Sequence, residues 1–224
     1  MRNQILQGIS GASLAGENVV IIDVFRAVPT AISILQKNPR KYWMTSSEKN
    51  IISSSPETIR IGKPFMGSDV RYDAPNSPSI VSKMNLLGKD IIHRTAGCGG
   101  CLDALKNPKI ILLCSFSNIQ ITSKFIQSHG GNWDIIAAGH QGLSPVEEDN
   151  YCARVLLNGN PQPNFDKRTN DLRYIGSAKF FQKGCNEYPL DDLDLCLDSR
   201  QNSQLIIAKS LGGMWYLQNS QKST

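Results

Sequence analysis

The sequence lacks a hydrophobic run long enough to cross a membrane. Its longest apolar runs are Ile110–Cys114 and Ile135–Gly139, whereas a transmembrane helix needs about 18 consecutive apolar residues. The residues at the amino terminus are mixed and polar, without the apolar segment of a secretory signal. We therefore expect no membrane partner and no secretory signal.

The sequence also lacks a cluster of basic residues. Its net charge is +5 over 224 residues, which is modest, and nucleic-acid-binding proteins usually carry a Lys/Arg stripe with interleaved aromatic residues. We therefore expect no nucleic-acid partner. The small positive charge is compatible with an anionic small-molecule substrate but does not require one.

Cysteine is too sparse for a disulfide scaffold. Six cysteines are spread over the chain, unlike the dense spacing of small secreted domains. Cys114 and Cys152 lie among apolar residues, which predicts small core side chains. These features indicate a reducing, cytoplasmic compartment.

Short apolar segments, each followed by a turn-forming stretch, recur along the chain. The predicted strands are Asn18–Val24, Thr58–Ile61, Asp90–His93, Lys109–Cys114 and Asp134–Ala138. Helices are predicted over Thr30–Gln36, with Pro29 in the first turn, and over Asn118–Ser128, with Ser117 as N-cap. Strands that are apolar throughout are buried on both faces. The alternation therefore predicts an α/β fold with three layers, α/β/α, around a central mixed sheet.

The remaining segments give weaker signals. Between Trp43 and Lys89 the pattern weakens. Within it the stretch KPFMGSDVRYDAPNSPSIVSKMN, residues 63–85, is rich in Gly, Pro, Asn and Ser, which predicts a long ordered loop. Asn158–Leu172 is predicted to be a polar linker, Arg173–Cys185 a helix, and Asp191–Leu197 a short helix or turn. We predict a single domain over residues 1–224, with a weak subdivision near 158–172 as the alternative.

Polar and glycine residues follow the predicted strands directly. In open α/β sheets, ligands bind beyond the carboxyl ends of the strands, so five loops are predicted to converge on one rim. The residues at these positions are Asp23 and Arg26; Gly62 and Lys63; Arg94, Thr95 and Gly97; Ser115 and Asn118; and Gly139 and Gly142.

Asp23 and two arginines carry the clearest chemistry. An aspartate at the end of a buried strand is costly unless it is paired or liganded. Asp23 is therefore predicted to be a metal ligand, a nucleophile or a base, or else the ion-pair partner of Arg26. Arginine suits bidentate contacts with phosphate or carboxylate, so Arg26 and Arg94 together indicate a substrate with a phosphate and a second acid group.

A helix start follows the last predicted strand. Ser144 is a candidate N-cap, Pro145 occupies the first helical position, and Glu147 completes a capping box. Glu148 and Asp149 are then either solvated acids of the first turn or, if they face the crevice, ligands of Mg²⁺, which prefers oxygen.

The stretch Cys98-Gly-Gly-Cys101 has three interpretations: a zinc site, a thiol-redox pair, or a phosphate-binding turn that runs into a helix. Zinc usually needs two further Cys or His ligands at matching spacing, and none is recognisable. Thr95 and the backbone N–H groups from Ala96 to Gly99 lie where a helix would begin, which suits an anion. A Cys98 thiol there would have a lowered pKa. Asn76-Ser77-Pro78 is either a simple turn or part of the site.

Five segments, in this order and spacing, resemble the 2-phosphosulfolactate phosphatase family. They are VVIIDVFRA, Asn76-Ser77-Pro78, Arg94-Thr95-Ala96-Gly97, CSFSN and AAGHQGLSPVEEDNYCA, and the resemblance spans about Asn18 to Leu157. It implies a three-layer α/β/α fold and a Mg²⁺-dependent phosphatase that hydrolyses 2-phosphosulfolactate to sulfolactate and phosphate, a step of coenzyme M synthesis. It also implies a small anionic phosphate ester as the partner and a homodimer as the assembly.

The resemblance implies site roles for Asp23, Arg26, Asn76, Ser77, Thr95, Gly97, Ser115, Asn118, Glu148 and Asp149, with Cys152 and Ala153 packing behind the acidic pair. Together with the post-strand positions, it leads us to predict catalytic roles for Asp23, Arg26, Arg94, Glu148 and Asp149, and Mg²⁺ coordination by Asp23, Glu148 and Asp149. The predicted substrate-binding residues are Lys63, Asn76, Ser77, Thr95, Gly97, Ser115 and Asn118. Either Asp23 attacks phosphorus directly or a carboxylate activates water.

The sequence departs from the family pattern at two positions. Lys63 stands where the family usually has Glu, and Cys98 stands where the third loop usually ends in a hydroxyl residue. Two alternatives therefore stay beside the phosphatase. One is a homologue without catalysis that binds an anionic ligand, and the other is a CxxC thiol-redox protein.

Overall fold

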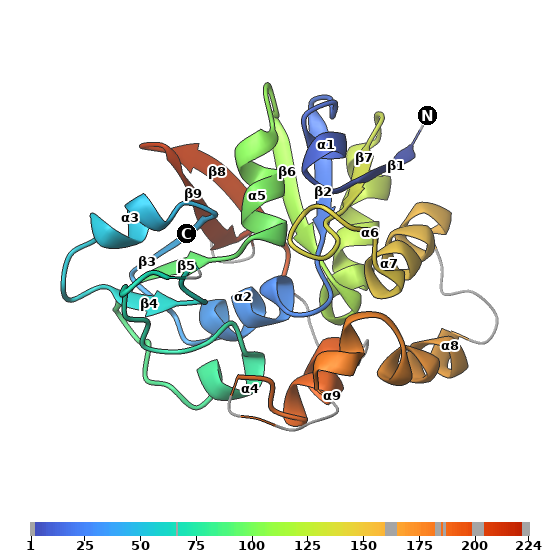
Figure 1. Cartoon of the computed structure of the whole chain (residues 1–224). Helices are drawn as coiled ribbons and strands as arrows, with labels where there is room; N and C mark the ends of the chain where they lie inside the picture. Colours follow the sequence, from blue (N-terminus) through green and yellow to red (C-terminus); the bar gives the residue numbers. More distant parts are fainter. Residues whose placement is uncertain are drawn as a thin grey trace.

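A computed structural model of the chain describes residues 3–65, 67–159, 165–181, 185, 187–198 and 204–220. Its strands form one nine-stranded sheet in the order β1-β7-β2-β6-β8-β9-β3-β5-β4 (Figure 1). They are β1 (Gln4–Gln7), β2 (Asn18–Ile22), β3 (Lys41–Thr45), β4 (Ile59–Ile61), β5 (Asp90–Arg94), β6 (Ile110–Cys114), β7 (Asp134–Ala137), β8 (Ile206–Leu211) and β9 (Met214–Asn219).

Helices connect these strands and cover the sheet. The α-helices are α1 (Gly8–Ala12), α2 (Ala27–Gln36), α3 (Glu48–Ile52), α4 (Pro78–Val81), α5 (Gly97–Ala104), α6 (Ile119–His129), α7 (Glu147–Asn158), α8 (Phe165–Asp171) and α9 (Asp191–Leu197). Short 3-10 turns are η1 (Phe116–Asn118), η2 (Leu172–Tyr174) and η3 (Gly176–Phe180). Among the described residues, none of these helices has the length and apolar character needed to cross a membrane.

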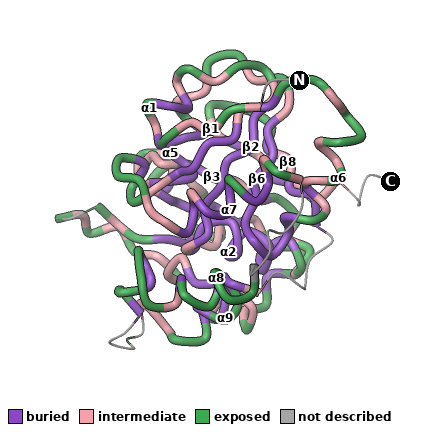
Figure 2. The backbone as a smooth tube through the Cα atoms, turned by 90° about the vertical axis from the view of Figure 1, so that its right-hand side faces the viewer, coloured by how far each residue is buried: buried purple, intermediate pink, exposed green. Residues whose placement is uncertain are grey.

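The central strands are buried on both faces, and their side chains alternate between two apolar clusters. Val19 and Ile21 of β2 pack into a cluster with residues of α2 and α5. Val20 and Ile22 point the other way, into a cluster with residues of α6, α7 and α9. Figure 2 shows this core as a buried interior with exposed segments around it. The predicted three-layer α/β/α fold with a mixed sheet is therefore confirmed.

Strand pairing divides the sheet into two parallel blocks. Strands β1, β7, β2 and β6 form one block, and β3, β5 and β4 form the other. The hairpin β8–β9 lies between the two blocks, and it pairs antiparallel with β6 on one side and with β3 on the other. The strands of one block would therefore run opposite to those of the other if the sheet were flat. Neighbouring strands are rotated by roughly 20–25°, and the accumulated twist turns the second block across the first (Figure 1). Loops of both blocks can therefore reach one space.

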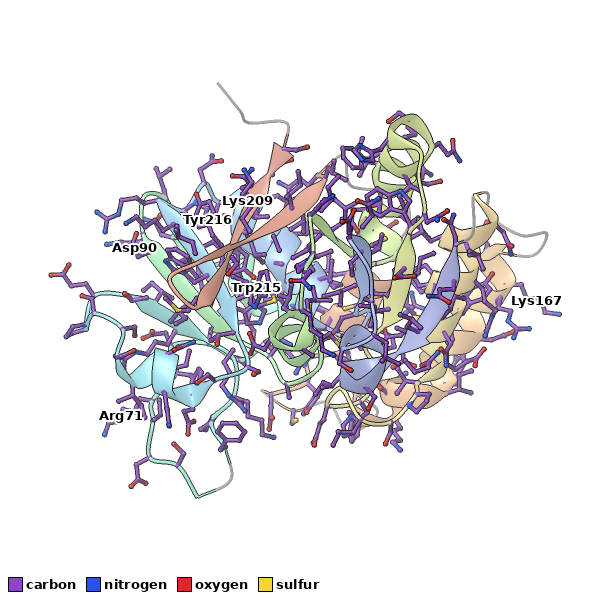
Figure 3. The ribbon with its side chains drawn as sticks, turned by 90° about the horizontal axis from the view of Figure 1, so that it is seen from above. Arg71, Asp90, Lys167, Lys209, Trp215 and Tyr216 are labelled. Carbon is purple, nitrogen blue, oxygen red and sulfur yellow. The ribbon has the colours of Figure 1, made fainter. Side chains whose placement is uncertain are left out.

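The hairpin is tied to the rest of the sheet by its aromatic residues. Trp215 donates from Nε1 to Asp103 Oδ1 of α5 over 2.9 Å, and the rings of Tyr216 and Trp43 lie 5.2 Å apart. Lys209 pairs with Tyr216 across the hairpin, and the two are labelled side by side in Figure 3. Residues of β9 thereby connect to both α5 and β3.

All five strands predicted from the sequence are present, as β2, β4, β5, β6 and β7. The sequence analysis predicts none of β1, β3, β8 and β9 and does not predict α3, and the loop predicted over residues 63–85 contains α4. The helix predicted over Arg173–Cys185 is wrong, because Ile175 is extended between η2 and η3, and Gly176, the first residue of η3, has a φ of 61°. The polar linker predicted over Asn158–Leu172 is wrong over Phe165–Asp171, which form α8. Residues 182–184 of the predicted helix and 160–164 of the predicted linker lie outside the described residues.

Two predicted helix caps are also wrong. The turn η1 precedes α6 and has Ser115 at its cap position, where the Ser115 backbone N–H donates to Asn118 Oδ1 over 2.9 Å. The N-cap position of α6 itself is Asn118 rather than Ser117. Helix α7 begins only at Glu147, because the carbonyl of Ser144 accepts a hydrogen bond from the backbone N–H of His140 over 2.8 Å and closes a turn.

Glu147 makes no capping box with Ser144. Its carboxylate forms ion pairs with Arg154 over 2.7 Å and with Arg168 over 3.4 Å on the surface. Glu147 is therefore an ion-pair partner on the surface and not part of a capping box.

Candidate active site

One cavity of about 940 Å³ lies where loops from both blocks meet. Its walls come from the loops after β2, β4, β5 and β7 and from the residues around η3. The predicted site residues that line it are Asp23, Arg26, Lys63, Asn76, Arg94, Thr95, Gly97, Glu148 and Asp149. The fold thus brings acidic and basic side chains that are far apart in the sequence into one space.

Three predicted substrate-binding residues, Ser77, Ser115 and Asn118, are not among the residues that line this cavity. The Ser77 hydroxyl is buried and donates to Asp192 Oδ1 over 2.9 Å. The Asn118 amide donates to the carbonyls of Leu113 over 3.0 Å and Gln204 over 3.2 Å. The loop after β6 is therefore anchored to its own strand and to the segment that leads into β8.

Asp23 directly follows β2 and is 7% exposed. Its Oδ1 accepts a hydrogen bond from Ala27 N at the start of α2 over 3.0 Å, and its Oδ2 accepts one from Cys98 N at the start of α5 over 3.3 Å. The unpaired N–H groups of two helix N-termini hold this carboxyl in place. Burial nevertheless raises the pKa of Asp23 to about 6, and the charge of Glu148 adds to the effect. Asp23 can therefore exchange a proton near neutral pH.

Glu148 and Asp149 lie in the first turn of α7 and are only 1% and 3% exposed. Asp149 accepts hydrogen bonds from Val24 N and Gly139 N, both over 2.8 Å. Glu148 accepts from Ser177 N, with its two oxygens at 3.3 and 3.4 Å. Burial raises the pKa of both carboxyls, and repulsion by Asp23 contributes at Asp149. The interpretation as solvated acids is therefore wrong. Cys152 and Ala153 are buried behind them, as the resemblance implies.

Arg26 is held by α9 and by the segment that precedes it. Its Nη1 donates to Asp192 Oδ2 over 2.8 Å and to the carbonyl of Glu187 over 2.7 Å. Its guanidinium carbon lies 4.4 Å from the ring centre of Tyr188, a cation–π distance. Arg26 therefore forms its ion pair with Asp192 and not with Asp23, the partner considered in the sequence analysis. Because a guanidinium carries five N–H donors, Arg26 keeps donors for an anion in the cavity.

Arg94 is held in a similar way by the other block. Its Nε donates to the carbonyl of Ser46 over 3.1 Å, and its Nη1 donates to the carbonyl of Lys63. Its guanidinium carbon lies 3.6 Å from the ring centre of Phe65. The Lys63 side chain itself forms an exposed ion pair with Glu187 over 2.7 Å. Lys63 and Glu187 therefore link the loops that hold the two arginines.

The CxxC pair is part of the core. Cys98 and Cys101 are buried free thiols on α5. Burial raises the pKa of Cys98 well above its ordinary value and that of Cys101 to about 12, so the lowered pKa predicted for Cys98 is wrong. A Cβ on Gly99 would lie 2.8 Å from the backbone carbonyl of Thr45. The glycines therefore let α5 pack against the end of β3, and the pair lacks the accessible thiolate of a redox site.

The acidic side of the cavity fits a divalent cation by the chemistry of its donors. Mg²⁺ binds oxygen, keeps several waters, and often uses only one or two carboxylates. Burial disfavours the charged forms of Asp23, Glu148 and Asp149, a cost that a bound cation would offset. In the part of the chain that the structure describes, no group of three or more His, Cys, Asp or Glu side chains is arranged as a metal cluster.

The sequence analysis assigned no role to several residues of the site. Asp192 is fully buried beside Arg26, and its only local signal is an acid within the apolar pattern of DDLDLCL. His93 is buried at the end of β5 and contacts Asn76. The aromatic residues that line the cavity are Phe25, Phe65, Tyr72, Phe180, Phe181 and Tyr188. Their loops have no periodic pattern that would have indicated this position.

Comparisons with known proteins identify relatives of the chain. The family model described as 2-phosphosulpholactate phosphatase matches residues 4–206. A protein of Thermus thermophilus described as a probable 2-phosphosulfolactate phosphatase is 27% identical over 152 residues, which make up 66% of this chain. The matched part spans 64% of the length of that relative.

Proposed function

The chain belongs to the 2-phosphosulpholactate phosphatase family, and on this premise we propose that it hydrolyses the phosphate monoester of a small organic acid, 2-phosphosulfolactate or a close relative. The observation that carries the proposal is the lining of the cavity. Three buried carboxyls and two buried guanidinium groups face one space. Phosphoryl transfer needs cationic groups around the phosphate and a carboxylate to handle the proton or the nucleophile.

Arg26 and Arg94 are the proposed anion-binding groups. Each has a low exposure of 6% and is fixed by hydrogen bonds to backbone carbonyls, so little ordering is needed when an anion binds. They come from different blocks of the sheet and can engage two anionic groups of one substrate. The Thr95 hydroxyl and the N-terminus of α5 add neutral donors at the same wall.

Asp23 is the proposed proton-transfer group. Hydrolysis forms a bond from a water oxygen to phosphorus and breaks the bond from phosphorus to the ester oxygen. Asp23 can accept the proton of the attacking water at a carboxylate oxygen, and that proton can return to the departing alcohol. Burial raises the pKa of Asp23 to about 6 without a cation, and a bound cation would lower it. Direct attack by Asp23 on phosphorus is the alternative. Detection of phosphate covalently bound to Asp23 in an acid-quenched reaction would show that Asp23 attacks phosphorus directly.

Mg²⁺ is the proposed cofactor, held by Asp23 together with Glu148 or Asp149. When bound, it would polarise a phosphoryl oxygen and offset its charge. The backbone N–H groups that bind these carboxylates, on Ala27, Gly139 and Ser177, keep their oxygens oriented.

A substrate panel tests this function. The panel contains 2-phosphosulfolactate, other phosphorylated hydroxy acids and a generic aryl phosphate, each with Mg²⁺ or with a chelator. We expect Mg²⁺-dependent phosphate release that favours the phosphorylated acids, and a loss of at least about 100-fold in Asp23→Asn, equivalent to roughly 2.7 kcal/mol of transition-state stabilisation. Binding of these acids without any turnover would support the non-catalytic alternative instead. Equal activity of the Cys98→Ser, Cys101→Ser double variant would exclude the thiol-redox alternative.

A further inference from the structure

Three hydrogen-bonded side chains lead from the core to the wall of the cavity. The Tyr42 hydroxyl of β3 lies 2.8 Å from His93 Nδ1 of β5, and His93 Nε2 lies 3.0 Å from Asn76 Oδ1. Tyr42 and His93 are 1% and 0% exposed, whereas Asn76 is partly exposed and lines the cavity. The state of two buried groups is therefore connected to a side chain that can touch a ligand.

The Tyr42 hydroxyl determines where the hydrogens of this series lie. A buried phenol must donate its hydrogen, and the acceptor that Tyr42 contacts is His93 Nδ1. Burial raises the pKa of Tyr42 well above its ordinary value, so the hydroxyl keeps its hydrogen. Nδ1 is therefore an acceptor, and a neutral imidazole then carries its hydrogen on Nε2.

The imidazole is neutral because of its surroundings. Burial lowers the pKa of His93 to about 3, and the charge of Arg26 contributes in the same direction. Tyr42 and Asn76, the partners of its two nitrogens, carry no charge.

We propose that His93 is a positioning residue, which fixes the Asn76 amide with its carbonyl toward the core and its NH₂ group toward the cavity. A flipped amide would set two donors, the Nε2–H and the NH₂ group, against each other. The NH₂ group can only donate, so it favours a group that can only accept. A fully ionised phosphate, carboxylate or sulfonate has this property. The identity of the anion rests on the proposed function, but the orientation of the amide does not.

The tautomer can be measured directly by NMR of the full chain labelled with ¹⁵N-histidine. The chain has three histidines, namely His93, His129 and His140, and His93→Gln assigns the first. We expect a hydrogen on Nε2 and none on Nδ1, unchanged from roughly pH 6 to 8, where a free histidine titrates. A hydrogen on Nδ1, or a doubly protonated ring, would overturn the proposal whether or not the chain is a phosphatase.

Binding of inorganic phosphate, measured by calorimetry, tests the consequence for the site. Asn76→Asp keeps an oxygen for His93 but replaces the donor by an acceptor, so we expect phosphate to bind about 100-fold more weakly, against about tenfold for Asn76→Ala. His93→Leu alone should weaken phosphate binding as much as Asn76→Ala alone. The double variant should bind phosphate no more weakly than Asn76→Ala. His93→Gln, which retains a donor, should restore part of the affinity.

The result that separates positioning from mere folding is the double variant. If His93→Leu weakens binding as strongly beside Asn76→Ala as it does alone, His93 acts through the fold and the proposal is wrong. Circular dichroism checks that the His93 variants fold, and if they do not, the comparison of Asn76→Asp with Asn76→Ala and the NMR result still decide. Phosphate that does not bind the unaltered chain would count against the proposed function, while the NMR result would still decide the orientation of Asn76.

Discussion

The carboxylate of Asp192 accepts a hydrogen bond from Arg26 over 2.8 Å, although 166 residues separate the two. Its second oxygen accepts from the Ser77 hydroxyl and from Ser79 N, both over 2.9 Å. Asp192 is fully buried. Helix α9 thus fixes an arginine of the cavity and the start of α4 at one point.

Replacement of this carboxylate should damage both stability and the site. In Asp192→Asn the guanidinium of Arg26 loses its buried counter-charge, so we expect the free energy of unfolding to fall by about 3 kcal/mol. The Arg26 side chain should also lose its orientation, and kcat/KM for the phosphate ester should fall about 10- to 100-fold. Urea denaturation and steady-state kinetics measure the two effects.

Asp194 offers a matched control on the same helix. It pairs with Arg173 over 2.7 Å, but its side chain is 73% exposed, and exposed ion pairs contribute little to stability. Asp194→Asn should leave both measurements nearly unchanged. Equal effects of the two substitutions would mean that the Arg26 contact has no special role.

Asp23 should reduce the stability of the fold at neutral pH. Because burial raises its pKa from 3.8 to about 6, the folded state binds the proton more tightly than the unfolded state, and stability is lost as pH rises from about 4 through about 6. At roughly 1.4 kcal/mol per pKa unit the cost approaches 3 kcal/mol. Asp23→Asn removes this cost of the buried charge but loses one hydrogen bond, which contributes about 1 kcal/mol. Asp23→Asn should therefore be inactive, yet about 2 kcal/mol more stable near pH 8.

The pH dependence of this difference is its test. The advantage of Asp23→Asn should shrink toward pH 4, where Asp23 is protonated. Asp90→Asn is a control in which the change in stability with pH should have the opposite sign, because the hydrogen bond with Arg40 lowers the pKa of Asp90. That contribution is present above the unfolded pKa and is lost as pH falls. An Asp23→Asn variant that is less stable than the native chain at pH 8 would contradict the predicted cost of the buried charge.

Mg²⁺ should stabilise the chain in a manner that depends on pH and on Asp23. A cation present at about 100 times its dissociation constant adds roughly 2.7 kcal/mol to the free energy of unfolding. Protonated carboxyls do not bind metal, so the rise in melting temperature should be large near pH 8 and small near pH 5. The rise should also disappear in Asp23→Asn. A rise of equal size in that variant would locate the bound Mg²⁺ elsewhere.

Gly176 should be indispensable for the position of Glu148. It has a φ of 61°, and a Cβ at this position would overlap with Glu148 Oε2. Gly176→Ala should therefore displace the carboxylate, lower the unfolding free energy by about 3 kcal/mol and reduce activity at least about tenfold. Gly212 has a φ of 62° with no atom within 4 Å of its added Cβ. Gly212→Ala, which shares only the backbone strain, should cost about 1 kcal/mol and retain activity. If the two variants behave alike, the contact with Glu148 is unimportant.

Much of the fold follows from local sequence pattern. The apolar run that becomes β2, Asn18–Ile22, predicts a strand buried on both faces, and its side chains do alternate between two cores. β1 could not be found in this way, because Gln4–Gln7 is short and forms by pairing with β7. The Gly212-Gly213 pair between β8 and β9 is a typical hairpin signal. Its insertion between β6 and β3 is a long-range pairing that no local pattern encodes.

The site was predictable where a residue lies at the end of a strand or directly after it. Asp23 and Arg94 follow this rule and line the cavity. Asn118 does not, because its amide is occupied by the carbonyls of Leu113 and Gln204. Asp192 and His93 could not be assigned, since their importance lies in partners that only the folded chain brings near.

The hairpin β8–β9 also sets the order in which the molecule can be completed. Its neighbours β6 and β3 are both made earlier, and each leaves an unpaired edge until Ile206–Asn219 has been synthesised. Open edges of this kind attract other chains. The sheet that carries Arg26 on one block and Arg94 on the other therefore becomes continuous only when the last residues of β9, up to Asn219, are in place.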